Sequence, residues 1–267
     1  MNILEKIVIH KRAETGERQK LYPLELLKKS IHFQAPCVSL KQYILRPDKC
    51  GIIAEFKRRS PSKGDINPYA DVEKISIGYM QAGASALSVL TDEKFFGGSN
   101  DDLKTARKYN YCPVLRKDFI IDPYQIYEAK AIGADAVLLI AAILSAEEIR
   151  RFTRLTHDLG MEVLLEFYDE QELEKYTEEA DLVGINNRNL KDFGVNLDHS
   201  VQMAKQLPAA AVKIAESGIE RPEDVMRLKK AGFDGFLIGT LFMKEVHPER
   251  ACRQFIQSLR SLQKTTS

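Results

Sequence analysis

The stretch Ala131-Ile-Gly-Ala-Asp-Ala-Val137 decides the fold of this chain, because it joins the end of a helical pattern to the start of an apolar strand. The same signature recurs as AGASAL at residues 82–87 and as KAGFDGF at residues 230–236. In each copy we expect the first glycine to end the helix in the left-handed conformation that glycine tolerates. A helix that leads repeatedly into a buried strand is typical of a parallel α/β sheet.

Short apolar runs rich in β-branched residues recur along the chain and predict eight strands. They lie at Gly51–Phe56, Ala86–Leu90, Pro113–Arg116, Ala136–Ile140, Glu162–Phe167, Leu182–Asn186, Val212–Glu216 and Gly235–Ile238. Helical patterns separate them, for example at Tyr124–Ile132, Ala146–Leu159, Glu170–Thr177, Val201–Gln206 and Pro222–Ala231. Eight such units favour an α/β fold of the (βα)8 TIM-barrel type over an open doubly wound sheet, which usually has fewer strands. No GxGxxG follows the first strand.

Residues 1–48 lie outside this repeat and predict an N-terminal helical extension. Two apolar helix faces are indicated: Ile3, Leu4, Ile7 and Val8 for the first, and Leu24, Leu26, Leu27 and Ile31 for the second. We expect the extension to pack over one end of the barrel, because it has too little apolar content to form a domain. Since about 250 residues suffice for one barrel, residues 1–267 are predicted to form a single domain.

Composition excludes several classes of protein. The net charge of +1 gives no support for nucleic-acid binding. The longest apolar runs, such as Ala136–Leu144, are shorter than the roughly 20 residues of a membrane span, and the N-terminus lacks a secretory pattern, so we expect a cytoplasmic protein. The four cysteines and five histidines are scattered, which argues against disulfides, a metal site and Ser–His or Cys–His catalysis. Any proton chemistry is therefore expected to use lysine and glutamate.

Polar and charged residues end several of the predicted strands, where the active site of a TIM barrel is built. Glu55 and Lys57 are two residues apart, so that on a strand they point to the same face. An acid and an amine at the end of a buried strand are costly, and such a cost often marks a site. Later strands end in further candidates of this kind: Lys117, Glu166, Asn186, Arg188 and Glu216.

Each candidate also has a structural alternative. The run Lys57-Arg58-Arg59 could be a solvated basic cluster or a targeting signal, Glu55 with Lys57 a structural ion pair, Lys117 a surface lysine, and 186–188 a turn. Glu166 is harder to dismiss, because it follows Val163-Leu164-Leu165, where a carboxylate needs a partner or a raised pKa. These alternatives are independent of one another, so we favour an active site.

Small residues predict a phosphate site next to these charges. Loops after the seventh and eighth strands of TIM barrels commonly bind phosphate through backbone N–H groups. Here those loops contain Ser217 with Gly218 and Gly239 with Thr240. Barrel closure places the first strand beside the eighth, so Ser60 is expected to join the same pocket. A phosphorylated small molecule is indicated rather than a nucleotide, because no Walker A arrangement is present.

Six segments, in chain order, resemble the indole-3-glycerol phosphate synthase family: IIAEFKRRSPSKG, VLRKDFI, LLEFYDEQEL, VGINNRNL, IAESGI and LIGTLFM. The resemblance covers essentially the whole chain, including the extension. It implies a (βα)8 barrel that needs no metal or organic cofactor. The implied reaction, part of tryptophan biosynthesis, converts 1-(2-carboxyphenylamino)-1-deoxyribulose 5-phosphate to indole-3-glycerol phosphate, carbon dioxide and water.

The resemblance also implies a role for each site residue. Lys117 matches the general acid that protonates the substrate's ketone, Glu166 the acid/base carboxylate, and Lys57 the lysine that contacts the substrate carboxylate and helps in dehydration. The division of acid duties between the two lysines stays open. The remaining matches are Glu55 as the partner of Lys57, Asn186 and Arg188 as contacts of the sugar hydroxyls and the anthranilate part, Glu216 as a further acid, and Ser60, Ser217, Gly218, Gly239 and Thr240 as the phosphate cradle.

Three further expectations concern the surroundings of the site. The apolar side chains Phe95, Phe96, Phe119 and Leu138 are expected to wall the anthranilate ring. Neighbouring cations such as Arg116 or Lys57 are expected to lower the pKa of Lys117 toward neutrality, where an acid works best. The chain departs from the family pattern at Tyr168, where histidine is frequent, and at Lys191-Asp192-Phe193, where threonine commonly precedes the phenylalanine.

Two other functions remain open from the sequence. A Schiff-base aldolase would use Lys57 or Lys117 as its nucleophile. A non-catalytic phosphosugar-binding protein would use the same barrel, although its charge set is expected to have lost a member. We expect a monomer that acts on a small phosphosugar.

Overall fold

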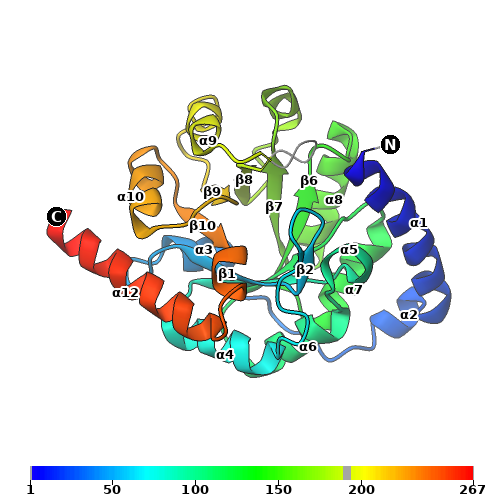
Figure 1. The fold of residues 1–267 in the computed structure, drawn as a ribbon. Coiled ribbons are helices and arrows are strands. Elements are labelled where there is room, and N and C mark those ends of the chain that lie inside the picture. Colours follow the sequence, from blue (N-terminus) through cyan, green and yellow to red (C-terminus); the bar gives the residue numbers. More distant parts are fainter. Residues whose placement is uncertain (1, 189–193, 267) are drawn as a thin grey trace.

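The computed structural model describes residues 2–188 and 194–266. In this part of the chain eight parallel strands close into a barrel, in the order β1-β10-β9-β8-β7-β6-β5-β4 (Figure 1). The strands are β1 (Ile52–Phe56), β4 (Ala86–Leu90), β5 (Val114–Lys117), β6 (Ala136–Ile140), β7 (Glu162–Phe167), β8 (Leu182–Asn186), β9 (Lys213–Glu216) and β10 (Gly235–Ile238). The predicted (βα)8 barrel is confirmed, and each predicted strand is found to within one residue at either end.

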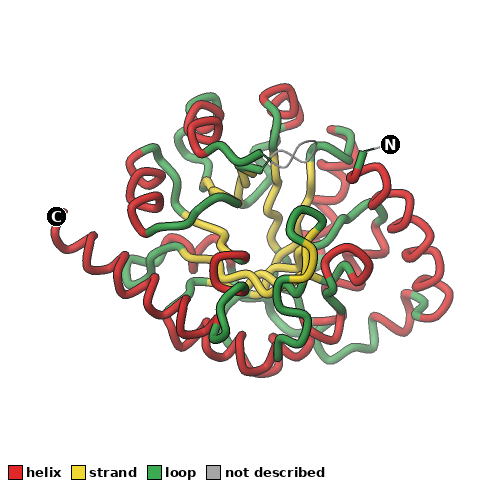
Figure 2. Tube along the Cα trace, in the orientation of Figure 1, coloured by secondary structure: helices red, strands yellow, loops and turns green. Residues whose placement is uncertain are grey.

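Helices surround the strands on the outside (Figure 2). The barrel helices are α4 (Val72–Ala82), α5 (Glu93–Phe96), α6 (Asn100–Tyr109), α7 (Pro123–Ile132), α8 (Ala146–Asp158), α9 (Leu197–Ala204), α10 (Pro222–Lys230), α11 (Thr240–Met243) and α12 (Pro248–Thr266). The loop after β1 holds a small hairpin of β2 (Arg59–Ser60) and β3 (Gly64–Asp65). The predicted left-handed glycines are confirmed, since Gly83, Gly133 and Gly232 all have positive φ.

Two helix predictions need correction. The segment predicted as a helix over Glu170–Thr177 is a 3-10 helix, η1 (Glu170–Lys175), as is common in short connectors. Helix α9 begins at Leu197, earlier than predicted, because the side chain of Asn196 accepts a hydrogen bond from the backbone of Asp198 and caps the helix. Helices α4, α6 and α12 were not among the ranges given as examples, although the glycine of AGASAL predicted the end of α4.

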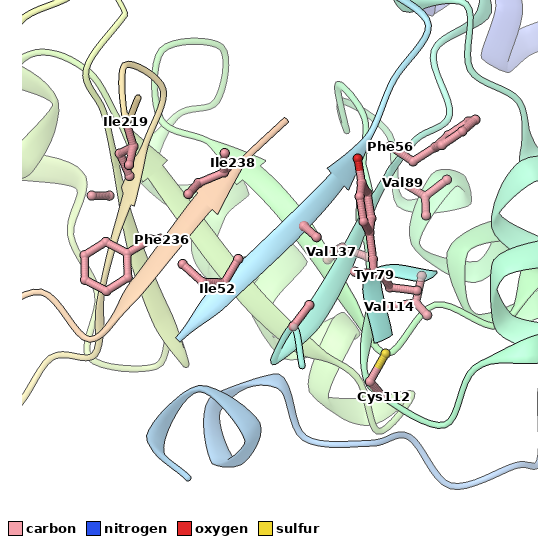
Figure 3. Close-up of a cluster of buried hydrophobic side chains, with 14 of the residues drawn as sticks. Ile52, Phe56, Tyr79, Val89, Cys112, Val114, Val137, Ile219, Phe236 and Ile238 are labelled. Atoms are coloured by element: carbon pink, nitrogen blue, oxygen red, sulfur yellow. The ribbon is translucent and has the colours of Figure 1, made fainter. Parts of the chain in front are cut away.

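Side chains alternate along each strand and build two apolar layers. Ile52 and Phe56 of β1 point outward and join a layer between strands and helices, part of which is drawn in Figure 3. Ile53 lies between them and points into the barrel, where it packs with Leu115, Leu164 and other inward residues. The same alternation turns Glu55 inward, because it follows Ile53 by two residues.

The N-terminal extension packs at both ends of the barrel, whereas one end was expected. It consists of α1 (Ile3–Leu21), α2 (Leu24–Leu27) and α3 (Leu40–Leu45). Leu40 and Ile44 of α3 belong to the barrel's inner cluster, and Ile44 lies against Gly235 at the amino end of β10. Helix α1 (dark blue in Figure 1) lies on the side of α7, and its first turns reach the opposite end. The predicted second helix ends at Leu27, so Ile31 falls outside it and is exposed.

Helix α3 supplies a stability prediction. Leu40 is fully buried, so Leu40→Ala is expected to lower the free energy of unfolding by about 2–5 kcal/mol through lost contacts and a residual cavity. Leu45 of the same helix is half exposed, and Leu45→Ala is expected to change it by less than about 1 kcal/mol. Urea denaturation of both variants checks this. Equal losses of unfolding free energy in the two variants would show that the contact of α3 with the barrel interior does not stabilise the fold.

Candidate active site

A cavity of about 640 Å³ opens at the carboxyl ends of the strands. Alternation along the strands directs one polar side chain from each of several strands into it: Glu55 from β1, Lys117 from β5, Glu166 from β7, Asn186 from β8 and Glu216 from β9. Lys57 and Arg188 follow two of these strands and also line it. All seven charged or amide residues that the sequence predicted therefore lie around one cavity.

Lys117 lies between two buried carboxyl groups. Its Nζ donates to Oε2 of Glu166 at 2.8 Å and to Oε2 of Glu216 at 2.6 Å. Both carboxyl groups therefore contact the same ammonium group. Lys117 is thus not a surface lysine, and the partner that Glu166 required is present.

The environments of the two glutamates drive their pKa values apart. Burial would raise the pKa of Glu166, but Lys117 and hydrogen bonds from Glu216, Lys117 and Asn186 outweigh it and hold this pKa below its usual value. Burial raises the pKa of Glu216 to about 8, and the negative charge of Glu166 adds to this effect while Lys117 opposes it. Of the two carboxyl groups, Glu216 therefore holds a proton more tightly than Glu166 does.

The expected lowering of the pKa of Lys117 is wrong. Burial would lower this pKa, but the carboxylates of Glu166, Glu216 and Glu55 outweigh it and raise the pKa above its usual value. Arg116 does not contribute as expected, because it alternates with Lys117 on β5 and points away from the cavity. Its guanidinium instead donates to Glu128 at 2.7 Å and to Asp118 at 3.1 Å.

Lys57 and Glu55 form the predicted pair, with Nζ of Lys57 at 2.7 Å from Oε1 of Glu55. Two glycines make room for the carboxyl groups of the site. A Cβ atom at Gly239 would lie 2.4 Å from Oε1 of Glu55, and one at Gly184 would lie 2.3 Å from Oε1 of Glu216. Since real Cβ contacts are longer, no other residue fits at either position without displacing a carboxyl group.

The predicted phosphate residues lie together on the wall formed by the loops after β1, β9 and β10. All five line the cavity: Ser60, Ser217, Gly218, Gly239 and Thr240. Ser217 has a φ of 66°, in the left-handed region that serine rarely adopts, and Gly218 follows with a φ of 75°. Strain of this kind is held at ligand sites more often than elsewhere.

An apolar wall lies across the cavity from these loops. Phe96, Phe119 and Leu138 line it as expected, and the rings of Phe96 and Phe119 are 5.8 Å apart. Phe95 does not line the cavity. Neighbouring side chains on a helix point about 100° apart, and the ring of Phe95 packs instead against His10 of α1, at 5.8 Å.

Asn186 and Arg188 are connected through the chain that leaves β8. Oδ1 of Asn186 accepts a hydrogen bond from the backbone N–H of Arg188 at 3.0 Å. Tyr168 does not line the cavity, and its ring lies 5.5 Å from that of His199. The departure at Lys191-Asp192-Phe193 lies outside the described residues.

Several lining residues were missed by the sequence analysis. Ile3, Leu4 and Ile7 of α1 form part of the wall, although their helical spacing was the only signal available. Two further cations, Lys63 and Lys244, also line the cavity. Lys63 stands in a polar loop and Lys244 directly follows α11, and for neither does the sequence indicate which way the side chain points.

The described part of the chain contains neither a metal-binding cluster nor a membrane-spanning helix. No three histidine, cysteine, aspartate or glutamate side chains are grouped there so as to hold a metal ion. Within residues 2–188 and 194–266, no helix is long and apolar enough to cross a membrane.

Comparison with known proteins agrees with this geometry. The sequence pattern of the family "Indole-3-glycerol phosphate synthase" matches residues 4–255. An indole-3-glycerol phosphate synthase of Bacteroides thetaiotaomicron is 48% identical over 258 residues, which cover 97% of this chain and 99% of that protein. An indole-3-glycerol phosphate synthase of Carboxydothermus hydrogenoformans is 42% identical, and the alignment covers 93% of this chain and 97% of that protein. The chain belongs to the indole-3-glycerol phosphate synthase family. The family resemblance predicted from the sequence is confirmed.

Solved structures that resemble this chain support the barrel fold. The tryptophan synthase subunit alpha of Legionella pneumophila superposes with a TM-score of 0.62 at 16% identity, covering 85% of this chain and 99% of that one. The thiamine phosphate pyrophosphorylase of Pyrococcus furiosus gives 0.59 at 16% identity, with 80% and 98% covered. At this identity the likeness concerns the barrel alone.

Proposed function

We propose that this chain converts 1-(2-carboxyphenylamino)-1-deoxyribulose 5-phosphate to indole-3-glycerol phosphate, carbon dioxide and water. The observation that carries the proposal is Lys117 held between Glu166 and Glu216, at 2.8 Å and 2.6 Å, at the end of a cavity with an apolar wall and a wall of small residues. Pairs of carboxyl groups whose pKa values are driven apart are typical of acid/base sites. Membership of the family supports the same reaction.

Lys117 acts as the general acid of ring closure. The aromatic carbon that bears the carboxylate attacks the ketone, and the oxygen of the ketone becomes an alkoxide as the carbon–carbon bond forms. The raised pKa of Lys117 keeps it an ammonium, with a proton ready at Nζ. An alkoxide is a much stronger base than an amine, so the proton still moves downhill to the oxygen.

Loss of carbon dioxide needs no electron sink from the protein. Ring closure breaks the aromaticity of the anthranilate ring and leaves an iminium-like group, which accepts the electron pair of the departing carboxylate. Lys57, held by Glu55, contacts that carboxylate and then assists the loss of water. Glu166, as the ionised member of its pair, is the base of the dehydration, and protonated Glu216 keeps it in place.

The two walls orient the substrate for this chemistry. Phe96, Phe119 and Leu138 pack on the anthranilate ring, and the loops with Ser60, Ser217, Gly218, Gly239 and Thr240 hold the phosphate through short polar groups and backbone N–H donors. Asn186 and Arg188 contact the sugar hydroxyls and the anthranilate part. Holding both ends brings the aromatic carbon to the ketone and lowers the entropy cost of the closure.

The Schiff-base alternative receives less support. A Schiff base requires a neutral amine, whereas Glu166 and Glu216 keep Lys117 protonated and Glu55 pairs with Lys57. Purified protein should therefore form the fluorescent indole product from the anilino-ribulose phosphate and give no stable adduct on borohydride treatment. A borohydride-stable adduct without indole formation would support the aldolase and overturn the proposal.

The raised pKa of Glu216 predicts the pH dependence of kcat/KM. Below pH 8 Glu216 is neutral, and the ammonium group of Lys117 faces the carboxylate of Glu166. As the pH rises through about 8, Glu216 loses its proton, and the site gains a negative charge that repels an anionic substrate. We expect kcat/KM to fall above this point and to level off at a lower value once Glu216 is ionised. The variant Glu216→Gln should lack this fall.

Glu162→Gln is the matched control for the pH profile. Glu162 begins β7 at the opposite end of the barrel, where its carboxylate accepts from the backbone of Lys41 at 2.8 Å. This variant should keep the fall above pH 8. If Glu216→Gln keeps it as well, the ionisation belongs to another group. The cytoplasmic location, the monomeric state and the single domain expected from the sequence stay predictions.

A further inference from the structure

Lys11 of α1 is a buried cation that the proposed mechanism does not use. Its side chain is 2% exposed, and its Nζ lies 3.0 Å from Asp92, 3.0 Å from Asp118 and 2.8 Å from Glu14. Burial would lower the pKa of Lys11, but these three carboxylates outweigh it and raise the pKa above its usual value. Lys11 is therefore charged, and it does not line the cavity itself.

Asp118 and Asp92 belong to the two segments that carry Phe119 and Phe96 of the apolar wall. Asp118 directly follows Lys117, and its Oδ1 also accepts the backbone N–H of Phe119 at 2.8 Å. Asp92 is the N-cap of α5, where its Oδ1 accepts the backbone N–H of Phe95 at 2.7 Å and so sets the helix that carries Phe96. The ammonium group of Lys11 thus connects α1 both to the carboxyl end of β5 and to α5.

Helix α1 also forms part of the cavity wall. Its residues Ile3, Leu4 and Ile7 line the cavity, one to two turns before Lys11. A second tie lies further along α1. Arg18 pairs with Glu128, which also accepts from Arg116 on β5. Arg116 also pairs with Asp118 at 3.1 Å, and Asp118 pairs with Lys11. The ion pairs therefore form a continuous series that begins at Arg18 and ends at Lys11, both on α1.

Burying these charges is costly, and a buried ion pair is weak evidence for stability. The effect of Lys11 on geometry is a better argument than its effect on stability. Without the cation between them, the buried carboxylates would repel one another and move apart. A shift of about 1 Å in a group that holds the substrate can cost about a hundredfold in rate.

We propose that Lys11 is a positioning residue that fixes the β5 end with Lys117, the α5 wall and the α1 wall around the anthranilate end of the substrate. The proposal rests on the proposed function, because it assigns that end of the cavity to the aromatic ring. The phosphate end is built by loops that Lys11 does not contact.

The test compares Lys11→Met with Lys130→Met in the full chain. Lys130 is a matched control because it is also a buried lysine that ties the extension to the barrel, donating to the backbone carbonyl of Ala35 at 2.7 Å without lining the cavity. We expect Lys11→Met to lower kcat/KM about tenfold to a hundredfold, and Lys130→Met to stay within about twofold of wild type. The inhibition constant of inorganic phosphate as a competitive inhibitor should be the same in both variants as in wild type, because Lys11 does not contact the phosphate loops. Equal effects of the two variants on kcat/KM, or wild-type kcat/KM in Lys11→Met, would overturn the proposal.

Two further measurements keep the test decisive. If Lys11→Met does not fold, Asp92→Asn decides, because asparagine still caps α5 but loses the charge that pairs with Lys11. It should lower kcat/KM severalfold, and wild-type kinetics would overturn the proposal. Hydrogen exchange at 93–96 and 117–120 should be faster in Lys11→Met than in Lys130→Met, and equal exchange would contradict it. This readout needs no turnover, so an inactive wild-type protein would refute the proposed function while the exchange data still decided the role of Lys11.

Discussion

Lys117→Met is expected to lower kcat by about 10²–10⁴-fold while the barrel stays folded. The substitution removes the proton donor of ring closure and leaves Glu166 and Glu216 without the cation that lies 2.8 Å and 2.6 Å from them. Glu166 should then share the proton with Glu216 and lose its function as a base. Initial rates of indole formation at saturating substrate, together with circular dichroism, measure both parts of this expectation.

Lys213→Met is the control for this variant. Lys213 is also a buried barrel lysine, but it begins β9 at the other end and donates to the carbonyl of Pro208 at 2.9 Å. Its replacement should lower the melting temperature and leave kcat within a few-fold of wild type. A Lys117→Met protein with wild-type turnover would refute the role of Lys117 as the acid.

Glu166→Gln is expected to have an effect of similar size, with kcat lower by about 10²–10⁴-fold. Glutamine keeps the size and the acceptor oxygen of the side chain but cannot take a proton from the substrate. Because Lys117 and Glu166 act as one hydrogen-bonded unit, the double variant should lose little more than the more impaired single variant. Single-turnover rates of the three variants check both expectations.

Glu172→Gln serves as the comparison for Glu166→Gln. Glu172 lies in η1, where its carboxylate accepts the backbone N–H groups of Tyr168 and Asp169 at 2.8 Å and 3.3 Å, and it does not line the cavity. Its replacement should affect stability more than turnover. Fully additive losses in the double variant would contradict the view that Lys117 and Glu166 form one unit.

Much of the barrel and the site was predictable because strand periodicity fixes which side chains point inward. Ile53 and Glu55 share one face of β1, and Leu164 and Glu166 share one face of β7, so an apolar inward residue followed by a charged one marks a site residue. The same rule corrects the expectation for Arg116. Its place next to Lys117 in the sequence puts its side chain on the opposite face, where it meets Glu128 and Asp118.

The rest depended on contacts between distant segments. Nothing in the sequence of α1 shows that Lys11 meets Asp92 and Asp118, which lie about a third of the chain further on. The pKa of Lys117 likewise depends on three carboxylates from three other strands. Phe95 and Phe96 are adjacent in the sequence, so only the orientation of α5 decides which of the two rings faces the cavity.

The most direct test of the account is the product balance of the wild-type protein with 1-(2-carboxyphenylamino)-1-deoxyribulose 5-phosphate. The account predicts one molecule of indole-3-glycerol phosphate and one of carbon dioxide for each substrate consumed. Recovery of unchanged substrate, or release of carbon dioxide without an indole ring, would contradict it.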